Sequence, residues 1–242
     1  MNFMNSTKKK MKTKGVIMKK VIVISVQPEH VNNTLNHIKN IDVRKSCPEV
    51  FKNLKPYEGA EFEVYIYCSK NHGYLSYNDF EGYFYIKRKP KCTPILNGKA
   101  VAKFTLRKVS RIYGKETIFG DRFYTKTKEY MSDVEIEGSY DQLKIDAALQ
   151  FGTYLEDYFD GKLSKDQEER KQEKLIGYAW HIEDLVILDE PLELREHFYE
   201  VPDEEYVKWC KENSVHGQCI VQSITKAPQS WRFAYYDGKT ND

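Results

Sequence analysis

Lys39, Asp42 and Arg44 are the residues of this 242-residue chain whose types and spacing best suit chemistry. They lie in a segment where polar residues alternate with Ile41 and Val43, which predicts a short strand. Asp42 and Arg44 then project from one face, with Lys39 at the start of the strand. An acid, a planar cation and an ammonium can bind a base edge or a phosphate, or activate water. A solvated salt bridge explains the same pattern without a ligand.

Aromatic residues form a second candidate feature. A predicted strand over residues 61–69 places Tyr65 and Tyr67 on one face, and Tyr178 and Trp180 share a face of a later strand. Flat rings beside the charged cluster suit base stacking. Packing of Trp180 in the core, with its indole N–H bonded to the backbone, is the alternative. Trp231 is assigned to the core.

Charge is distributed unevenly although the formal net charge is only +2. Residues 87–128 carry 13 positive and 2 negative charges, whereas residues 129–213 carry 9 positive and 24 negative charges. The basic block is interleaved with aromatic residues, as in proteins that bind single-stranded nucleic acid. Its predicted phosphate contacts are Lys103, Arg107, Lys108 and Arg111. Alternatively, the basic block folds against the acidic one.

The remaining composition limits location and cofactors. Residues 1–18 are rich in lysine and are expected to form a disordered arm. No apolar run is long enough for a membrane span and no secretory signal is visible, so a cytoplasmic protein without a membrane partner is expected. Five cysteines without a paired spacing favour reduced thiols. Cys210, His216 and Cys219 are a weak zinc candidate whose spacing matches no common module, so neither metal nor other cofactor is expected.

The periodicity predicts an α+β fold, a small mixed β-barrel with a short early helix and a later helical insertion. Along the predicted strand over residues 98–112, the alternation of apolar residues changes phase, which indicates a bulge or bend. Predicted strands cover residues 20–27, 40–45, 61–69, 98–112, 177–188 and 229–236, with a hairpin at 74–86 and helices at 28–38, 141–159, 163–174 and 203–211.

Several motifs in consistent order resemble the ASCH domain family of the PUA-like superfamily, in particular prophage-borne ASCH proteins of Gram-positive bacteria. The resemblance covers residues 19–236, with insertions at about 115–175 and 196–226 and a tail at 237–242. The motifs are Val23-Ile-Ser-Val-Gln-Pro-Glu-His-Val31, Lys39-x-x-Asp42-x-Arg44-Lys45, Val64-Tyr-Ile-Tyr-Cys68, Gly98-Lys-Ala-Val-Ala-Lys-Phe104, Tyr178-Ala-Trp-His-Ile182, Asp189-Glu-Pro-Leu-Glu-Leu194 and Pro228-Gln-Ser-Trp231.

The resemblance implies a β-barrel whose cleft accepts RNA or a nucleoside. Some members remove an acyl group from a modified cytidine with a motif lysine, and Lys39 and Arg44 match the lysine and arginine of that motif. Asp42 stands where the hydrolases use a hydroxyl, and His37 replaces the motif glycine. A carboxylate beside Lys39 would keep the amine protonated, so these departures favour binding over hydrolysis.

The expected function is therefore recognition of single-stranded RNA, or of a modified nucleotide within it, by a phage or prophage protein. The predicted nucleotide-binding residues are Lys39, Asp42, Arg44, Tyr65, Tyr67 and Trp180. One alternative is an amidohydrolase for an acylated nucleoside, with Lys39 and Asp42 catalytic. Another is a phage protein that binds a host protein through its acidic segment at 129–213.

Overall fold

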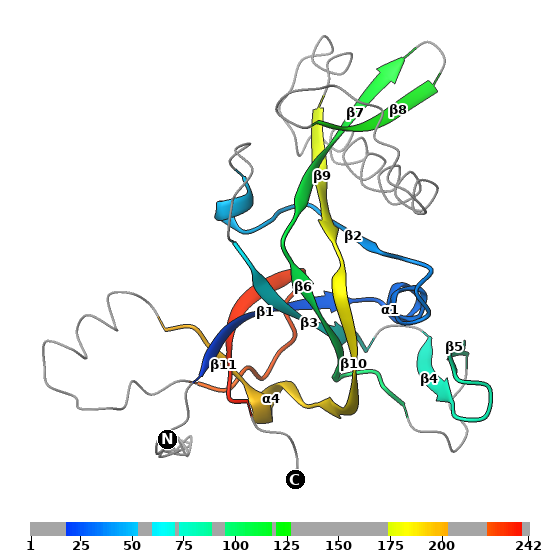
Figure 1. Ribbon diagram of the computed structural model, residues 1–242, viewed down its shortest axis with the longest axis vertical. Helices are drawn as coiled ribbons and strands as arrows, with labels where there is room; N and C mark the ends of the chain where they lie inside the picture. Colours follow the sequence, from blue (N-terminus) through cyan, green and yellow to red (C-terminus); the bar gives the residue numbers. More distant parts are fainter. Residues whose placement is uncertain are drawn as a thin grey trace, which may run out of the picture.

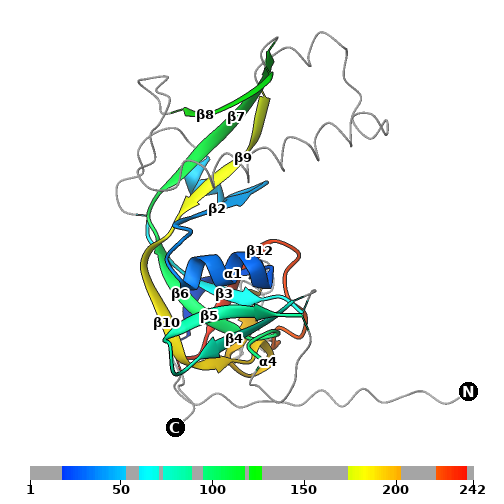
Figure 2. The same cartoon turned by 90° about the vertical axis from the view of Figure 1, so that its right-hand side faces the viewer.

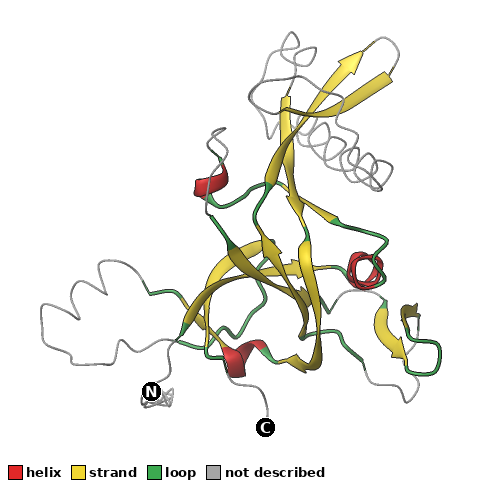
Figure 3. Ribbon diagram, viewed as in Figure 1, coloured by secondary structure: helices red, strands yellow, loops and turns green. Residues whose placement is uncertain are grey.

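The computed structural model describes residues 18–52, 60–70, 73–88, 95–117, 120–126, 174–202 and 222–238, with only the backbone described at 113–117, 120–126 and 174–176. This part of the chain is an α+β structure that consists mostly of strands (Figure 3). Its elements are β1 (Lys19–Val26), α1 (Pro28–Leu35), β2 (Ile41–Arg44), η1 (Glu49–Phe51), β3 (Phe62–Cys68), β4 (Tyr74–Asn78), β5 (Tyr83–Lys87), β6 (Ala100–Leu106), β7 (Val109–Thr117), β8 (Gly120–Lys126), β9 (Lys174–His181), β10 (Glu183–Leu192), α4 (Leu194–His197), β11 (Phe198–Glu200) and β12 (Trp231–Tyr236).

The main sheet has six strands in the order β10-β6-β3-β1-β12-β11 (Figure 1). β1 lies inside the sheet, parallel to β3 and antiparallel to β12, with Lys19 opposite Tyr236 and Ile24 opposite Trp231. The β-branched run of β1 explains this position, because a strand buried on both faces reads as a nearly continuous apolar run. The first and last described strands therefore pair inside the main sheet.

Side chains that alternate along the strands supply a core on each face of this sheet. Ile24 and Ile66 belong to one core, which also contains Trp180 and residues of α1. Val23 and Tyr65 belong to the other core, together with residues of α4 and β11. Both faces of the central strands are therefore covered by the chain itself.

A second sheet has four strands in the order β2-β9-β7-β8, and β4 and β5 form a separate hairpin. Figure 2 shows two strand pairs that continue from one sheet into the other, β6 into β7 and β9 into β10. The chain leaves regular pairing at Arg107, Lys108 and Ile182, where each long strand bends. The predicted bend in the strand over residues 98–112 is confirmed. Among the described strands, none of the three sheets closes into a barrel.

The helix predicted at 28–38 is present but ends at Leu35. His37 has a positive φ of 58°, and the carbonyl of Asn33 accepts the N–H groups of Ile38 and Lys39, so the helix cannot continue. The predicted hairpin at 74–86 is confirmed by the pairing of β4 with β5. The lysine arm up to residue 17, the helices predicted at 141–159 and 203–211, and all but the last residue of the helix predicted at 163–174 lie outside the described residues; Lys174 begins β9. No described helix is long and apolar enough to cross a membrane.

Candidate functional site

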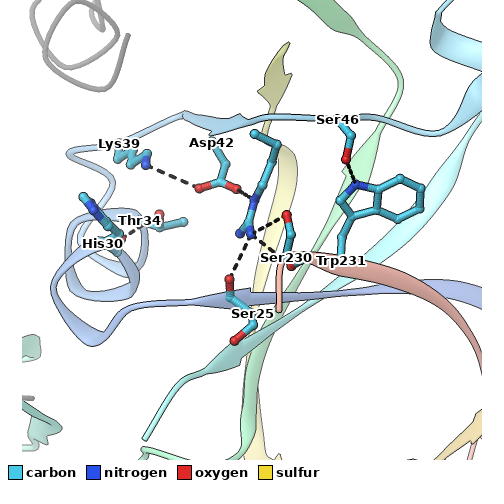
Figure 4. Close-up of polar contacts among 9 residues, drawn as sticks. Ser25, His30, Thr34, Lys39, Asp42, Ser46, Ser230 and Trp231 are labelled. Atoms are coloured by element: carbon cyan, nitrogen blue, oxygen red, sulfur yellow. Dashed lines mark hydrogen bonds and ion pairs between the residues drawn. The ribbon is translucent and has the colours of Figure 1, made fainter. Parts of the chain in front are cut away.

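The three predicted charged side chains meet, as the sequence indicated. Lys39 Nζ lies 3.4 Å from Asp42 Oδ1, and Arg44 Nε lies 2.5 Å from Asp42 Oδ2. Figure 4 shows Lys39 and Asp42 pointing toward each other. The three side chains are only 3%, 9% and 9% exposed. The arrangement is therefore a buried ionic cluster, and the explanation as a solvated salt bridge is wrong.

Backbone features on both sides of β2 hold this cluster. The end of α1 turns sharply at His37, which directs Lys39 back toward the strand. β2 pairs with β9, with Asp42 opposite Trp180 and Arg44 opposite Tyr178. Opposed residues of antiparallel strands project from the same face, so Trp180 and Asp42 are neighbours.

Close packing of β9 on β2 depends on Gly177. A Cβ atom at this position would lie 2.9 Å from the carbonyl oxygen of Arg44. Only glycine allows the two backbones to approach this closely without a shift.

Arg44 also links three separate segments. Its Nη1 donates hydrogen bonds to the carbonyl of Ser25 at 2.9 Å and to the carbonyl of Ser230 at 3.0 Å. Ser25 belongs to β1, and Ser230 directly precedes β12 (Figure 4). The guanidinium thus ties β2 to the centre of the main sheet.

Asp42 is ionised in this environment. Burial by itself raises the pKa of Asp42, but the charges and hydrogen bonds of Arg44 and Lys39 outweigh burial and lower the pKa below its usual value. Lys39 is paired with this ionised carboxylate at 3.4 Å, and a paired ammonium is not a nucleophile. The cluster is better suited to hold a polar or anionic group than to attack a carbonyl.

Trp180 lies beside this cluster and is fully buried. Its indole ring is 5.6 Å from that of Trp231, measured between ring centres. Trp231, which is partly buried, donates its indole N–H to Ser46 Oγ at 2.9 Å, whereas the indole N–H of Trp180 has no hydrogen-bond partner. Trp180 is in the core, but the expectation that the backbone satisfies its N–H is wrong. An unpaired buried donor costs about 1–3 kcal/mol.

Tyr65 and Tyr67 are not part of this arrangement. Both belong to the core on the opposite face of the main sheet from Trp180. Tyr65 is 1% exposed, its ring centre is 5.0 Å from that of Phe198, and its hydroxyl donates to Glu63. The sequence predicted the strand faces correctly, but it did not reveal that the chain covers the tyrosine face. The expected cleft of tyrosines with Trp180 is therefore corrected.

The predicted phosphate contacts are divided between paired and unpaired cations. Lys103 contacts Glu63 at 3.2 Å, and Arg107 forms three ion pairs. The partners of Arg107 are Glu61, Glu183 and Asp184. Part of the basic block is thus neutralised internally, by carboxylates from before and after it in the chain.

Lys108 and Arg111 differ from these two. Lys108 is exposed and forms no ion pair with a described carboxylate. Arg111 donates from Nη2 to the carbonyl of Lys52, and its Nε is buried without a hydrogen-bond partner. Lys108 is the more accessible of the two for a phosphate.

The weak zinc candidate formed by Cys210, His216 and Cys219 lies outside the described part of the chain. Within the described part, no group of three or more histidine, cysteine or acidic side chains is placed to hold a metal ion. Cys47 and Cys68 are free and buried, and burial raises the pKa of their thiols to about 11 and about 12.

Other residues around the cluster were not identified from the sequence. Ser25 and Ser230 contribute carbonyl groups from opposite ends of the chain, and no motif or spacing links them. His30 on α1 has a buried Nδ1 without a hydrogen-bond partner, and its carbonyl accepts from Thr34 (Figure 4).

Comparison with known proteins adds no assignment to this geometry. No family model, curated protein or solved structure matches the chain. The relationship to the ASCH family therefore stays a prediction from its motifs.

Proposed function

We propose that the chain recognises a nucleotide within single-stranded RNA at the cluster of Lys39, Asp42 and Arg44. The observation that carries this proposal is that Asp42, which is already paired with Arg44, also contacts a second buried cation, Lys39. Arg44 pairs with Asp42 and also links strands, which gives the Arg44–Asp42 pair a structural use. Lys39 adds another positive charge to the same carboxylate while only 3% of its side chain is exposed.

Energetic considerations support a role beyond folding. Removing an ion from water costs several kcal/mol even after relaxation, and well-packed apolar residues often replace a buried ion pair without loss of stability. Together, these three side chains carry one more positive charge than negative charge.

The chemistry of the surrounding groups supports a nucleotide as the ligand. Lys39 and Arg44 are donors, Asp42 is an acceptor, and the neighbouring indole N–H of Trp180 is an unused donor. Base edges present both acceptors and donors, and phosphates present acceptors. We include a PUA-like domain of the ASCH family in the proposal, which the motifs and the strand-rich α+β architecture with bent strands support.

The test compares two lysines that differ in burial. Lys39→Met removes the buried ammonium but keeps a long apolar chain, and Lys45→Met removes an exposed ammonium one residue after β2. Binding of a short fluorescein-labelled single-stranded RNA is measured by fluorescence anisotropy. We expect Lys39→Met to raise Kd by about 5- to 150-fold, as loss of a base-edge contact does, with Lys45→Met near the parent value.

Thermal unfolding of both variants checks that each still folds. Equal affinity of Lys39→Met and the parent chain would exclude the cluster as the binding site. Turnover of an acylated cytidine that Lys39→Met abolishes, without affinity for RNA, would replace this proposal with the amidohydrolase.

A further inference from the structure

The hairpin of β4 and β5 exposes aromatic side chains at and near its turn. Six large hydrophobic side chains are exposed in the described part of the chain, and four of them lie on this hairpin or just after α1. We call Phe80 and Tyr83, at the turn end of the hairpin, the aromatic end; they are 97% and 44% exposed. The other two are Ile38 at 60% and Tyr77 at 41%, and Tyr77 lies on the opposite face of the hairpin from Tyr83.

Phe80 is held in the open by an ordered turn. Asn78 Oδ1 accepts the N–H groups of Phe80 at 3.1 Å and Glu81 at 3.3 Å, and the carbonyl of Asn78 accepts from Gly82 at 2.8 Å. Gly82 has a φ of 71°, which favours glycine. Burying a phenylalanine stabilises a fold by about 1.5–3 kcal/mol, and Phe80 contributes none of this. Grouped exposure of this kind marks an interaction site more often than scattered single residues do.

The base of the hairpin is fixed to the body of the protein on two sides. Asn36, at the end of α1, exchanges two hydrogen bonds with the backbone of Phe84, at 2.8 and 3.0 Å. Asn97 accepts the N–H of Leu75 and donates to the carbonyls of Ser69 and Gly73. Figures 1 and 2 both show the hairpin beside α1. The aromatic end is thus presented on a rigid support.

Positively charged side chains lie at the end of β5 that is far from the turn. Lys87 Nζ is 5.1 Å from the centre of the Tyr85 ring, which is 6.1 Å from that of Tyr83, and Arg88 follows with an exposed side chain. Asp79 and Glu81 at the tip are exposed acids. A phosphate backbone would be repelled at the tip and attracted near Arg88, while bases lie over the rings.

The aromatic end is also linked to the candidate site through the end of α1. Ile38 directly precedes Lys39, and Asn36 on the same helix end holds the hairpin. We propose that the aromatic end is a stacking surface for unpaired bases that flank the nucleotide bound at Lys39. This inference rests on the proposed function and makes the substrate an oligonucleotide rather than a free nucleoside.

The experiment measures binding of a short fluorescein-labelled single-stranded oligoadenylate to the full chain by anisotropy. Phe80→Ala and Tyr83→Ala remove exposed rings, and Val186→Ala removes an exposed aliphatic side chain on β10, outside the aromatic end. We expect each ring deletion to raise Kd by about 5- to 150-fold, the usual effect of losing one base–aromatic contact. Val186→Ala should bind as the parent does.

A second variant reports stacking directly. Phe80→Trp keeps a flat ring at the tip, so its affinity should match that of the parent, and the added indole fluorescence should be quenched when oligoadenylate binds. Parent binding with unchanged Kd in both ring deletions, or no quenching in Phe80→Trp, would overturn the stacking surface and leave the proposed function standing. No binding by the parent would overturn both.

A protein occupant would give a different result. If the chain sediments as a dimer and Phe80→Ala as a monomer, the aromatic end is a contact between two copies. That outcome also overturns the stacking surface.

Discussion

Asp42 holds two buried cations with one carboxylate, and each of its oxygen atoms has a different partner. The pair with Arg44 therefore does not satisfy the whole carboxylate. Three charged side chains below 10% exposure form a network in which removal of Asp42 would leave two buried cations without their shared carboxylate. The carboxylate is the member that both cations share.

Asp42→Asn should be strongly destabilising for this reason. The amide keeps the shape of the side chain but leaves Lys39 and Arg44 without their shared negative charge. We expect the free energy of unfolding to fall by about 3–5 kcal/mol, as when one partner of a buried ion pair is removed. Urea denaturation at pH 7 measures the loss, with Asp189→Asn on the exposed part of β10 as the control. An equal midpoint for both variants would contradict the burial of the cluster.

His181 should make stability depend on pH below neutrality. Burial, assisted by the charge of Lys108, lowers the pKa of His181 from 6.5 to about 4. Between these values the unfolded chain binds a proton that the folded chain does not, so stability falls as pH decreases from 6.5 to 4 and is unaffected by this residue above that window. The loss amounts to about 3 kcal/mol.

His181→Gln removes this titration. Urea midpoints measured across the same pH window should fall less steeply in His181→Gln than in the parent chain. Parallel curves would show that His181 is protonated equally in the folded and unfolded states. Ser110, whose hydroxyl lies 2.9 Å from His181 Nε2, is left unchanged in this comparison.

At the scale of single elements, the sequence predicted local structure well and pairing poorly. Alternation identified β2 and β3 and placed Asp42 with Arg44, because side-chain direction in a strand depends only on position. It could not show which sheet face is covered, and Tyr65 is buried by residues distant in sequence. The end of α1 was predicted too late, because a positive φ at His37 has no clear signal in the sequence.

The β2–β9 contact gives a prediction at this scale. Gly177→Ala would place Cβ 2.9 Å from the Arg44 carbonyl oxygen, so the two strands must separate by a few tenths of an ångström. We expect a loss of about 1–3 kcal/mol in the free energy of unfolding, the usual cost of an added methyl group in packed structure. Calorimetry measures this loss. A variant as stable as the parent would show that β9 does not depend on this close approach.

At the scale of the whole molecule, the main sheet joins strands from both ends of the described chain. β12 lies between β1 and β11, and one core packs on each side of the sheet. Such pairing closes a loop that includes nearly every described residue, so folding must meet a large entropy cost before β1 and β12 make contacts. Motif spacing predicts no such pairing, because the two strands share no local signal.

This topology predicts that β12 is required for cooperative folding. A chain that ends at residue 230 lacks the strand that pairs with β1 at six positions and separates β1 from β11. Buried N–H and C=O groups of β1 would then lose their partners, each at a cost of about 1–3 kcal/mol, which together exceed the usual stability of a domain. We expect no cooperative urea transition by circular dichroism, whereas a chain that ends at residue 238 should unfold as the parent does. A cooperative transition in the shorter chain would mean that the remaining strands form the sheet without β12. It would also mean that the hydrogen bond from Arg44 to the Ser230 carbonyl does not require β12.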